Sequence, residues 1–179
     1  VDYEEISSVL KGASLAGLLS IFLVGLILWF AFRNLRIIFS IIITILFGLI
    51  ITMGLATLFV GTLNLISVAF AVLFIGLSVD FGIQICTRII EDSKTLNFKK
   101  KIENNVLKIS NTLFLAATPS IIGFISFIPT SYIGLSELGI ISCIGLVVGL
   151  LSNILLLPSI LFFFPTAFKK EYIRQRFFV

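Results

Sequence analysis

Histidine is absent from this sequence of 179 residues, and charged side chains are scarce, at 12% of the total. The lack of histidine removes the commonest metal ligand and proton shuttle of proteins. Soluble domains usually carry about 25% charged residues, so the composition argues against a water-soluble globule. It also argues against a disordered chain, which combines low hydrophobicity with high net charge. What is abundant is apolar: 59% of the residues are hydrophobic, and the mean hydropathy is +1.20.

Cysteine is nearly absent as well, since the chain contains only Cys86 and Cys143. The apolar runs described below place these residues towards opposite faces of a membrane, whereas a disulfide needs Cα atoms within about 7 Å. We therefore expect two packed thiols. No nucleophile–base pair and no cluster of metal ligands is recognisable in the sequence. We expect neither an enzyme nor a site for a metal or cofactor.

Long apolar runs dominate what is present. A helix crosses a bilayer with about 20 apolar residues, in a range of about 17–25, and five runs of this chain are long enough. The sequence thus predicts an all-α polytopic membrane protein with five transmembrane helices. The runs are Gly12–Phe32, Ile37–Val60, Ile66–Cys86, Thr112–Ile128 and Leu138–Phe164.

The boundaries of the segments follow from these runs and their flanks. We expect residues 1–11 to precede the first helix, 89–110 to form a cytoplasmic connector, and 166–179 to form a basic tail. Because the sequence begins with valine rather than methionine, we expect a processed piece or a fragment. The expected transmembrane helices are 12–32, 37–60, 64–88, 111–129 and 135–165.

Basic residues gather on one side of the predicted helices. Of the thirteen lysines and arginines, only Lys11 falls on the other side. Because cytoplasmic loops of membrane proteins carry an excess of Lys and Arg, we expect a cytoplasmic C-terminus and an N-terminus on the outer face. The net charge of +4 is then explained by topology, and we expect no nucleic-acid partner.

The connector 89–110 shows a helical repeat of apolar residues. Phe98, Ile102, Val106 and Ile109 recur at helical spacing, with lysines between them. This pattern is typical of an amphipathic helix that lies on the inner leaflet. The alternative is a solvated connector whose periodicity is incidental.

Asp80 is the residue that points to function. It is the only charged residue inside any of the five apolar runs. A charge in the bilayer centre costs about 2.5–3.5 kcal/mol on translocon scales, and such residues commonly line proton or ion pathways. We therefore predict that Asp80 is a proton-relay carboxylate. The alternative is a neutral Asp held by hydroxyl or backbone partners.

Three neighbours on the same helix accompany Asp80. Gly76 lies four residues before Asp80 and Gln84 lies four residues after it, so Gly76, Asp80 and Gln84 share one helix face. Gly82 and Gly76 remove bulk, which lets another helix or water approach or merely lets helices pack closely. No second buried charge lies in these runs to pair with Asp80. We therefore expect that a charge partner comes from another half of the protein or from another subunit, or that Asp80 has none.

Other residues favour packing or bending of helices. Pro119 interrupts the fourth run and is expected to kink it, either as a hinge or as a passive bend. Gly145 and Gly149 form a Gly-x-x-x-Gly motif, which is typical of close helix contact.

Three stretches resemble one transporter family. Asn64–Gln84 closely resembles the fourth transmembrane helix of resistance-nodulation-division (RND) transporters, most of all the hopanoid-transporter branch that is related to MMPL-type lipid exporters. Ile122–Gly139 is similar to the same branch. So is Gly12-Ala13 together with Phe32–Arg36. The resemblance covers nearly the whole chain in the right order.

The resemblance implies a twelve-helix protein in two halves, each with a large periplasmic domain. This chain would then supply helices two to six of one six-helix half-bundle, with residues 1–11 as the end of the periplasmic domain. The family couples the proton gradient to export through acidic residues, and Asp80 matches the one on the fourth helix. The resemblance further implies the bacterial inner membrane, membrane lipids and protons as partners, hopanoid-like lipids as cargo, a missing second half and a homo-oligomer when the protein is complete.

Two departures from the family pattern stand out. Many relatives have Tyr after the Asp, whereas this chain has Phe81, and Ser131 stands where we expect an acidic residue. Two other functions also stay open. One is a sterol-sensing-like lipid-binding module, which would tolerate Asp80→Asn. The other is a non-transporting fragment of a split transporter.

Overall fold

Five long α-helices make up the computed structural model, which describes residues 3–61, 65–92 and 98–163. Each helix has 25 to 30 residues, so each is about 38–45 Å long at about 1.5 Å per residue. That length exceeds the roughly 30 Å hydrocarbon core of a bilayer. The helices are α1 (Tyr3–Phe32), α2 (Leu35–Phe59), α3 (Leu65–Glu91), α4 (Phe98–Ile125) and α5 (Ile133–Phe162).

Four of these helices are long and apolar enough to cross a membrane within the described residues. They are α2, α3 from Phe70, α4 from Ile102, and α5. Gly17–Phe32 of α1 is a further apolar stretch among the residues whose side chains are described. The all-helical architecture confirms the predicted fold class of a polytopic membrane protein.

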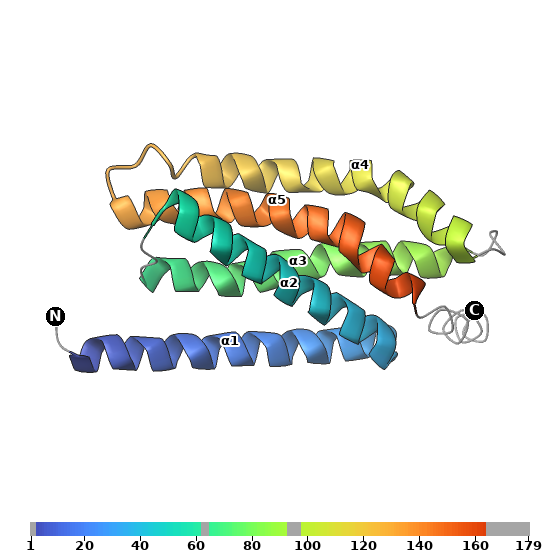
Figure 1. Ribbon diagram of the computed structural model, residues 1–179, viewed down its shortest axis with the longest axis horizontal. Coiled ribbons are helices and arrows are strands. Elements are labelled where there is room, and N and C mark those ends of the chain that lie inside the picture. Colours follow the sequence, from blue (N-terminus) through green and yellow to red (C-terminus); the bar gives the residue numbers. More distant parts are fainter. Residues whose placement is uncertain (1–2, 62–64, 93–97, 164–179) are drawn as a thin grey trace.

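Helix α5 occupies the centre of the bundle and packs against α2, α3 and α4. Figure 1 shows α2 and α5 running obliquely across α3, with α1 along one side of the bundle and α4 along the other. Helix α1 contacts α3 and α2. One apolar core joins all five helices, from Leu28 in α1 to Leu161 in α5. Helix α3 is therefore held from several sides.

Local signals in the sequence explain the tight connection between α1 and α2. Arg33 has a positive φ of 46° and its backbone N–H bonds to Trp29 O, which ends α1. The side chain of Asn34 then caps α2 by accepting a bond from the Arg36 N–H at 3.2 Å. Since an Asn cap satisfies an N–H that the helix leaves unpaired, α2 begins directly after the turn.

One end of the bundle carries the lysines and arginines of the described residues, with the exception of Lys11 near the start of α1. Figure 1 shows that α1 ends, α2 begins, α3 ends and α4 begins at this end. Six of the basic side chains at this end are exposed: Arg33, Arg36, Arg88, Lys99, Lys100 and Lys108. The charge separation predicted from the sequence is thus present in three dimensions.

The structure differs from the predicted segment boundaries at both ends of α4. Helix α4 begins at Phe98 and ends at Ile125, so much of the expected connector 89–110 is its first three turns. Ile102 is buried in the core and Val106 packs against it. The apolar side of this segment therefore faces the protein, which explains why the helix continues without a break. Asn105 also donates a 2.7 Å hydrogen bond to Asp92 beyond the end of α3.

Boundaries of the other helices are shifted as well. Helix α1 begins at Tyr3, although the apolar run that predicted it starts only at residue 12. Polar residues prolong this helix because nothing in the first eleven residues, such as Pro or Gly, breaks it before Gly12. Helix α5 begins at Ile133, two residues earlier than predicted. The basic tail 166–179 lies outside the described residues.

Candidate functional site

Helix α3 has one exposed polar face and one buried face. Gly76, Asp80, Gln84 and Arg88 follow one another at four-residue steps, and all four are exposed. The sequence placed these residues on a common face, and in the structure this face points away from the other helices. We call Gly76, Asp80 and Gln84 the open face of α3.

Asp80 lies near the middle of the apolar part of α3, which runs from Phe70 to Glu91. Among the described residues, no side chain donates a hydrogen bond to its carboxylate. Gly76, one turn away, has no atom within 4 Å of the position that a Cβ would take. The open face therefore offers a carboxylate in the middle of a membrane span, beside a gap that a helix backbone can approach.

The hydroxyl groups of the neighbouring helices do not serve Asp80. The hydroxyl of Thr44 bonds to Ser40 O at 2.9 Å, and that of Thr52 bonds to Gly48 O at 2.7 Å. The hydroxyl of Thr118 likewise bonds within its own helix. Such local bonds occupy the hydroxyl hydrogens, so none of these three groups donates a hydrogen bond to Asp80.

The buried face of α3 carries a polar contact of its own. The side-chain amide of Asn153 in α5 donates to Ser78 Oγ at 3.0 Å and to Ser78 O at 3.2 Å. Asn153 is fully buried, and Ser78 is 2% exposed. This contact lies at the depth of Asp80 but on the other side of the helix.

The glycines predicted for helix packing lie on this buried side. A Cβ on Gly82 would lie 3.1 Å from Asn153 Oδ1 and 3.1 Å from Ile41 Cγ2. Gly145 and Gly149 of α5 lie beneath two phenylalanine rings of α3. The space beside Gly82 is thus occupied by α5 and α2, and only Gly76 adjoins the open face.

The remaining sequence features lie apart from Asp80. Helix α4 continues through Pro119, which is exposed. Cys86 is buried in α3, and Cys143 is half-buried in α5 with its thiol 3.8 Å from Ile121 O. Neither cysteine forms a disulfide within the described residues, in line with the packed thiols expected from the sequence.

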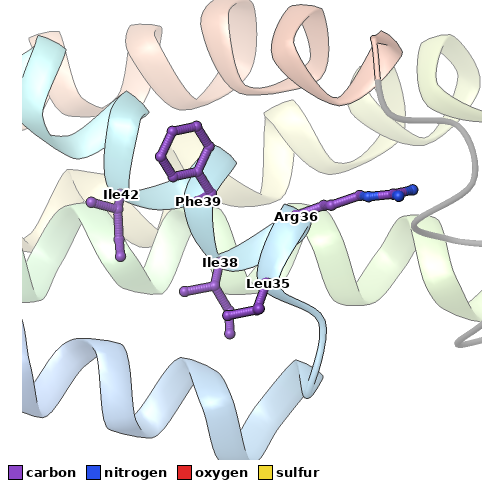
Figure 2. A pocket seen from close by; sticks show the side chains of 5 residues that line it. All are labelled: Leu35, Arg36, Ile38, Phe39 and Ile42. Carbon is purple, nitrogen blue, oxygen red and sulfur yellow. The ribbon is translucent and has the colours of Figure 1, made fainter.

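A separate hollow of about 430 Å³ lies at the start of α2. Figure 2 shows its five lining side chains, all from α2, with the guanidinium of Arg36 pointing away from the other four. The others are apolar: Leu35, Ile38, Phe39 and Ile42. None of them belongs to the open face of α3, so this hollow is not part of the candidate site.

Asn153 is the residue that the sequence analysis did not select as a site. It appears in the sequence as one amide among many small polar residues of the last apolar run. Its spacing was the available signal, because Gly145, Gly149 and Asn153 recur every four residues and so share one face of α5.

Comparison with known proteins bears on the family to which the chain belongs. The profile of the MMPL family matches residues 4–177. The hopanoid transporter HpnN of Burkholderia multivorans is 42% identical over 163 residues, which is 88% of this chain and 18% of that protein. HpnN of Rhodopseudomonas palustris is 41% identical over 169 residues, which is 94% of this chain and 20% of that protein.

The matches confirm the resemblance to hopanoid-type RND transporters that the sequence motifs indicated. The chain spans about a fifth of the length of these two relatives. Because the family profile covers nearly all of the sequence, the chain belongs to the MMPL family.

Proposed function

We propose that this chain is part of the membrane domain of a proton-driven exporter of hydrophobic lipids, and that Asp80 carries the proton. The observation that supports this proposal is the position of Asp80 on the open face of α3, in the middle of a membrane span. A carboxylate facing hydrocarbon costs about 2.5–3.5 kcal/mol. A residue with that cost and no packing role needs a functional reason.

A second group of helices is the natural cover for the open face. The chain spans 18% and 20% of the two HpnN proteins, so each of those proteins contains much more than these five helices. Gly76 leaves room for a helix backbone beside Asp80. In this arrangement the charge partner of Asp80 comes from the second half or from another subunit.

Protonation of Asp80 would switch the charge on this face. The neutral acid is tolerated in a dry helix interface, whereas the carboxylate requires water or a partner with positive charge. The neutral and the charged form of Asp80 thus favour two different packings of α3 against the helices that cover the open face. A proton that enters from one side of the membrane and leaves to the other switches between them. Gln84, one turn away, offers both a donor and an acceptor to whichever form is present.

The cargo class and the orientation rest on different observations. Both curated relatives are named as hopanoid transporters, which makes a hopanoid-like lipid the best candidate cargo. The basic end of the bundle would face the cytoplasm, because cytoplasmic loops are rich in Lys and Arg. Export from the inner membrane is the direction that fits a transporter of this family.

The test is lipid transport by the complete exporter in proteoliposomes that contain an isotope-labelled hopanoid. A pH gradient is imposed and the hopanoid transferred to acceptor vesicles is measured. We expect Asp80→Asn to reduce gradient-driven transfer to background. Glu91→Gln is the matched control, because Glu91 is an exposed acid on the same helix at the basic end of the bundle.

The outcome separates the alternatives. Loss of transfer in Asp80→Asn, with Glu91→Gln retained and equal protein in the vesicles, supports the proposal. Unchanged transfer in Asp80→Asn would overturn the relay. Hopanoid binding without any gradient-driven transfer in the unmodified protein would instead favour a lipid-binding module.

A further inference from the structure

A regular ladder of contacts joins the buried face of α3 to α5. A Cβ on Gly145 would lie 2.1 Å from Phe70 Cζ, and one on Gly149 would lie 3.2 Å from Phe74 Cε2. The Ser78–Asn153 contact continues the series, and its partners are 75 positions apart, as in the two phenylalanine–glycine pairs. The two helices are therefore parallel and in one fixed register.

The ladder changes its chemistry at the level of Asp80. In the first two pairs, a ring from α3 fills the space above a glycine of α5. In the third, Asn153 of α5 reaches towards α3, and Gly82 makes room for it, since a Cβ there would lie 3.1 Å from Asn153 Oδ1. The direction of insertion is reversed, so the helices interlock and resist sliding in either direction along their axes.

The geometry fixes the orientation of the Asn153 amide. Its nitrogen lies 3.2 Å from Ser78 O, 2.9 Å from Gly149 O and 3.0 Å from Ser78 Oγ. Two of these three acceptors are carbonyl oxygens, which require a donor. A reversed amide would bring Oδ1 against both carbonyls. Asn153 therefore holds the backbone of both helices, and not only a side chain.

The Asn153 contact also fixes the rotation of α3. Successive residues of a helix are about 100° apart, so Ser78 and Asp80 project in nearly opposite directions. Gly82 lies on the Ser78 side. A bond to the Ser78 backbone thus keeps the Asp80 carboxylate turned away from α5 and towards the open face.

We propose that Asn153 is a positioning residue for Asp80, and that it makes α3 and α5 move as one body during proton-coupled transport. The inference rests on the proposed function, because it assigns to Asn153 the alignment of the proposed proton carrier. Asn153 Oδ1 is buried without a hydrogen-bond partner among the described residues. A role in packing alone would be served better by an apolar side chain, since an unsatisfied buried polar atom is costly.

The first test replaces the amide by an apolar group of nearly the same size. Asn153→Leu and Asp80→Asn are assayed for pH-gradient-driven hopanoid transfer across a range of pH, at equal protein levels. We expect Asn153→Leu to lower the rate about tenfold or more, because a misplacement of about 1 Å costs up to about 100-fold. We also expect the pH midpoint of transfer to move, which a loss of packing alone would not cause.

Ser152→Ala is the matched control for Asn153→Leu. Ser152 is the preceding residue of α5 and is also buried, but it faces α2, where it lies 3.4 Å from a Cβ placed on Gly48. We expect its pH midpoint to equal that of the unmodified protein. A wild-type midpoint in Asn153→Leu, while Asp80→Asn is inactive, would overturn the positioning role and leave the proton relay standing.

A reversible link tests the joint movement and does not depend on the folding of Asn153→Leu. Ser78→Cys and Asn153→Cys are combined with Cys86→Ala and Cys143→Ala, and the two new thiols are joined by a short, reducible crosslinker. We expect low transfer in the reduced protein and recovery in the crosslinked fraction. Transfer that stays at the level of the reduced protein after crosslinking would contradict the proposal, because a fixed link between α3 and α5 would then not restore the function of Asn153. Transport that persists in Asp80→Asn would refute the proposed function by itself.

Discussion

Gly145→Ala is expected to destabilise the contact between α3 and α5. The added Cβ would lie 2.1 Å from Phe70 Cζ, 2.8 Å from Phe70 Cε2 and 3.0 Å from Thr52 Cγ2. Carbon atoms in contact are normally about 3.5–4.0 Å apart, so the ring must move by more than an ångström. Phe70 is 1% exposed and packs at a centroid distance of 5.7 Å on Phe74. Movement of the ring would therefore disturb this packing.

The magnitude follows from comparison with a second glycine. Overpacking of a well-packed core costs about 1–3 kcal/mol, but Gly→Ala within a helix also gains about 1 kcal/mol. Gly54→Ala receives the same gain without the clash, because no atom lies within 4 Å of its Cβ position and the site is exposed. The difference between the two variants in free energy of unfolding is therefore the overpacking alone, about 1–3 kcal/mol.

Labelling of Cys86 measures this difference. Cys86 follows Gly82 by one turn on the buried face of α3, and its exposed fraction is 0%. A thiol reagent reaches it only when α3 separates from the bundle, and its modification is followed by mass spectrometry of the complete protein. Since 1.4 kcal/mol is a factor of ten, we expect labelling to be about 5- to 150-fold faster in Gly145→Ala than in Gly54→Ala. Equal rates would refute the packing argument.

Three further outcomes are expected. Gly76→Ala should give the same Cys86 labelling rate as Gly54→Ala, because no atom lies within 4 Å of either Cβ position. It should nevertheless lower gradient-driven hopanoid transfer if a helix covers the open face, and unchanged transfer would argue against such a cover. Asn105→Ala removes the bond to Asp92 and should cost about 1 kcal/mol, seen as faster hydrogen exchange at the start of α4. Arg33→Gly should raise the melting temperature, because glycine adopts the positive φ of 46° without the penalty of about 1–2 kcal/mol.

The helical architecture could be predicted because the hydrophobic runs are long and uninterrupted. The ends of the helices were less predictable. The start of α4 was assigned to a connector because its lysines and Asn105 dilute the apolar pattern, yet Ile102 is buried in the common core. Hydropathy measures the fit of a segment to lipid, whereas this segment is held by protein contacts.

The open face could be predicted from helical periodicity, and the pairing of α3 with α5 could not. Spacing in the sequence places Gly76, Asp80 and Gln84 on one side of a helix whatever surrounds them. It does not state that residues 75 positions apart touch. The Gly145-x-x-x-Gly149 motif predicted a close contact without naming its partner, and the role of Asn153 appears only when α3 is laid against α5.

The two faces of α3 make opposite demands on one short stretch of sequence. The hydroxyl of Ser78 and the glycine Gly82 face α5, where Asn153 fills the space between them. Asp80, midway between these two residues, faces outward. The proposed proton carrier, Asp80, is useful only if its charge changes the position of something larger than a side chain. Because the buried face is interlocked with the central helix of the bundle, a force on Asp80 acts on α5 and, through its contacts, on α2 and α4 as well.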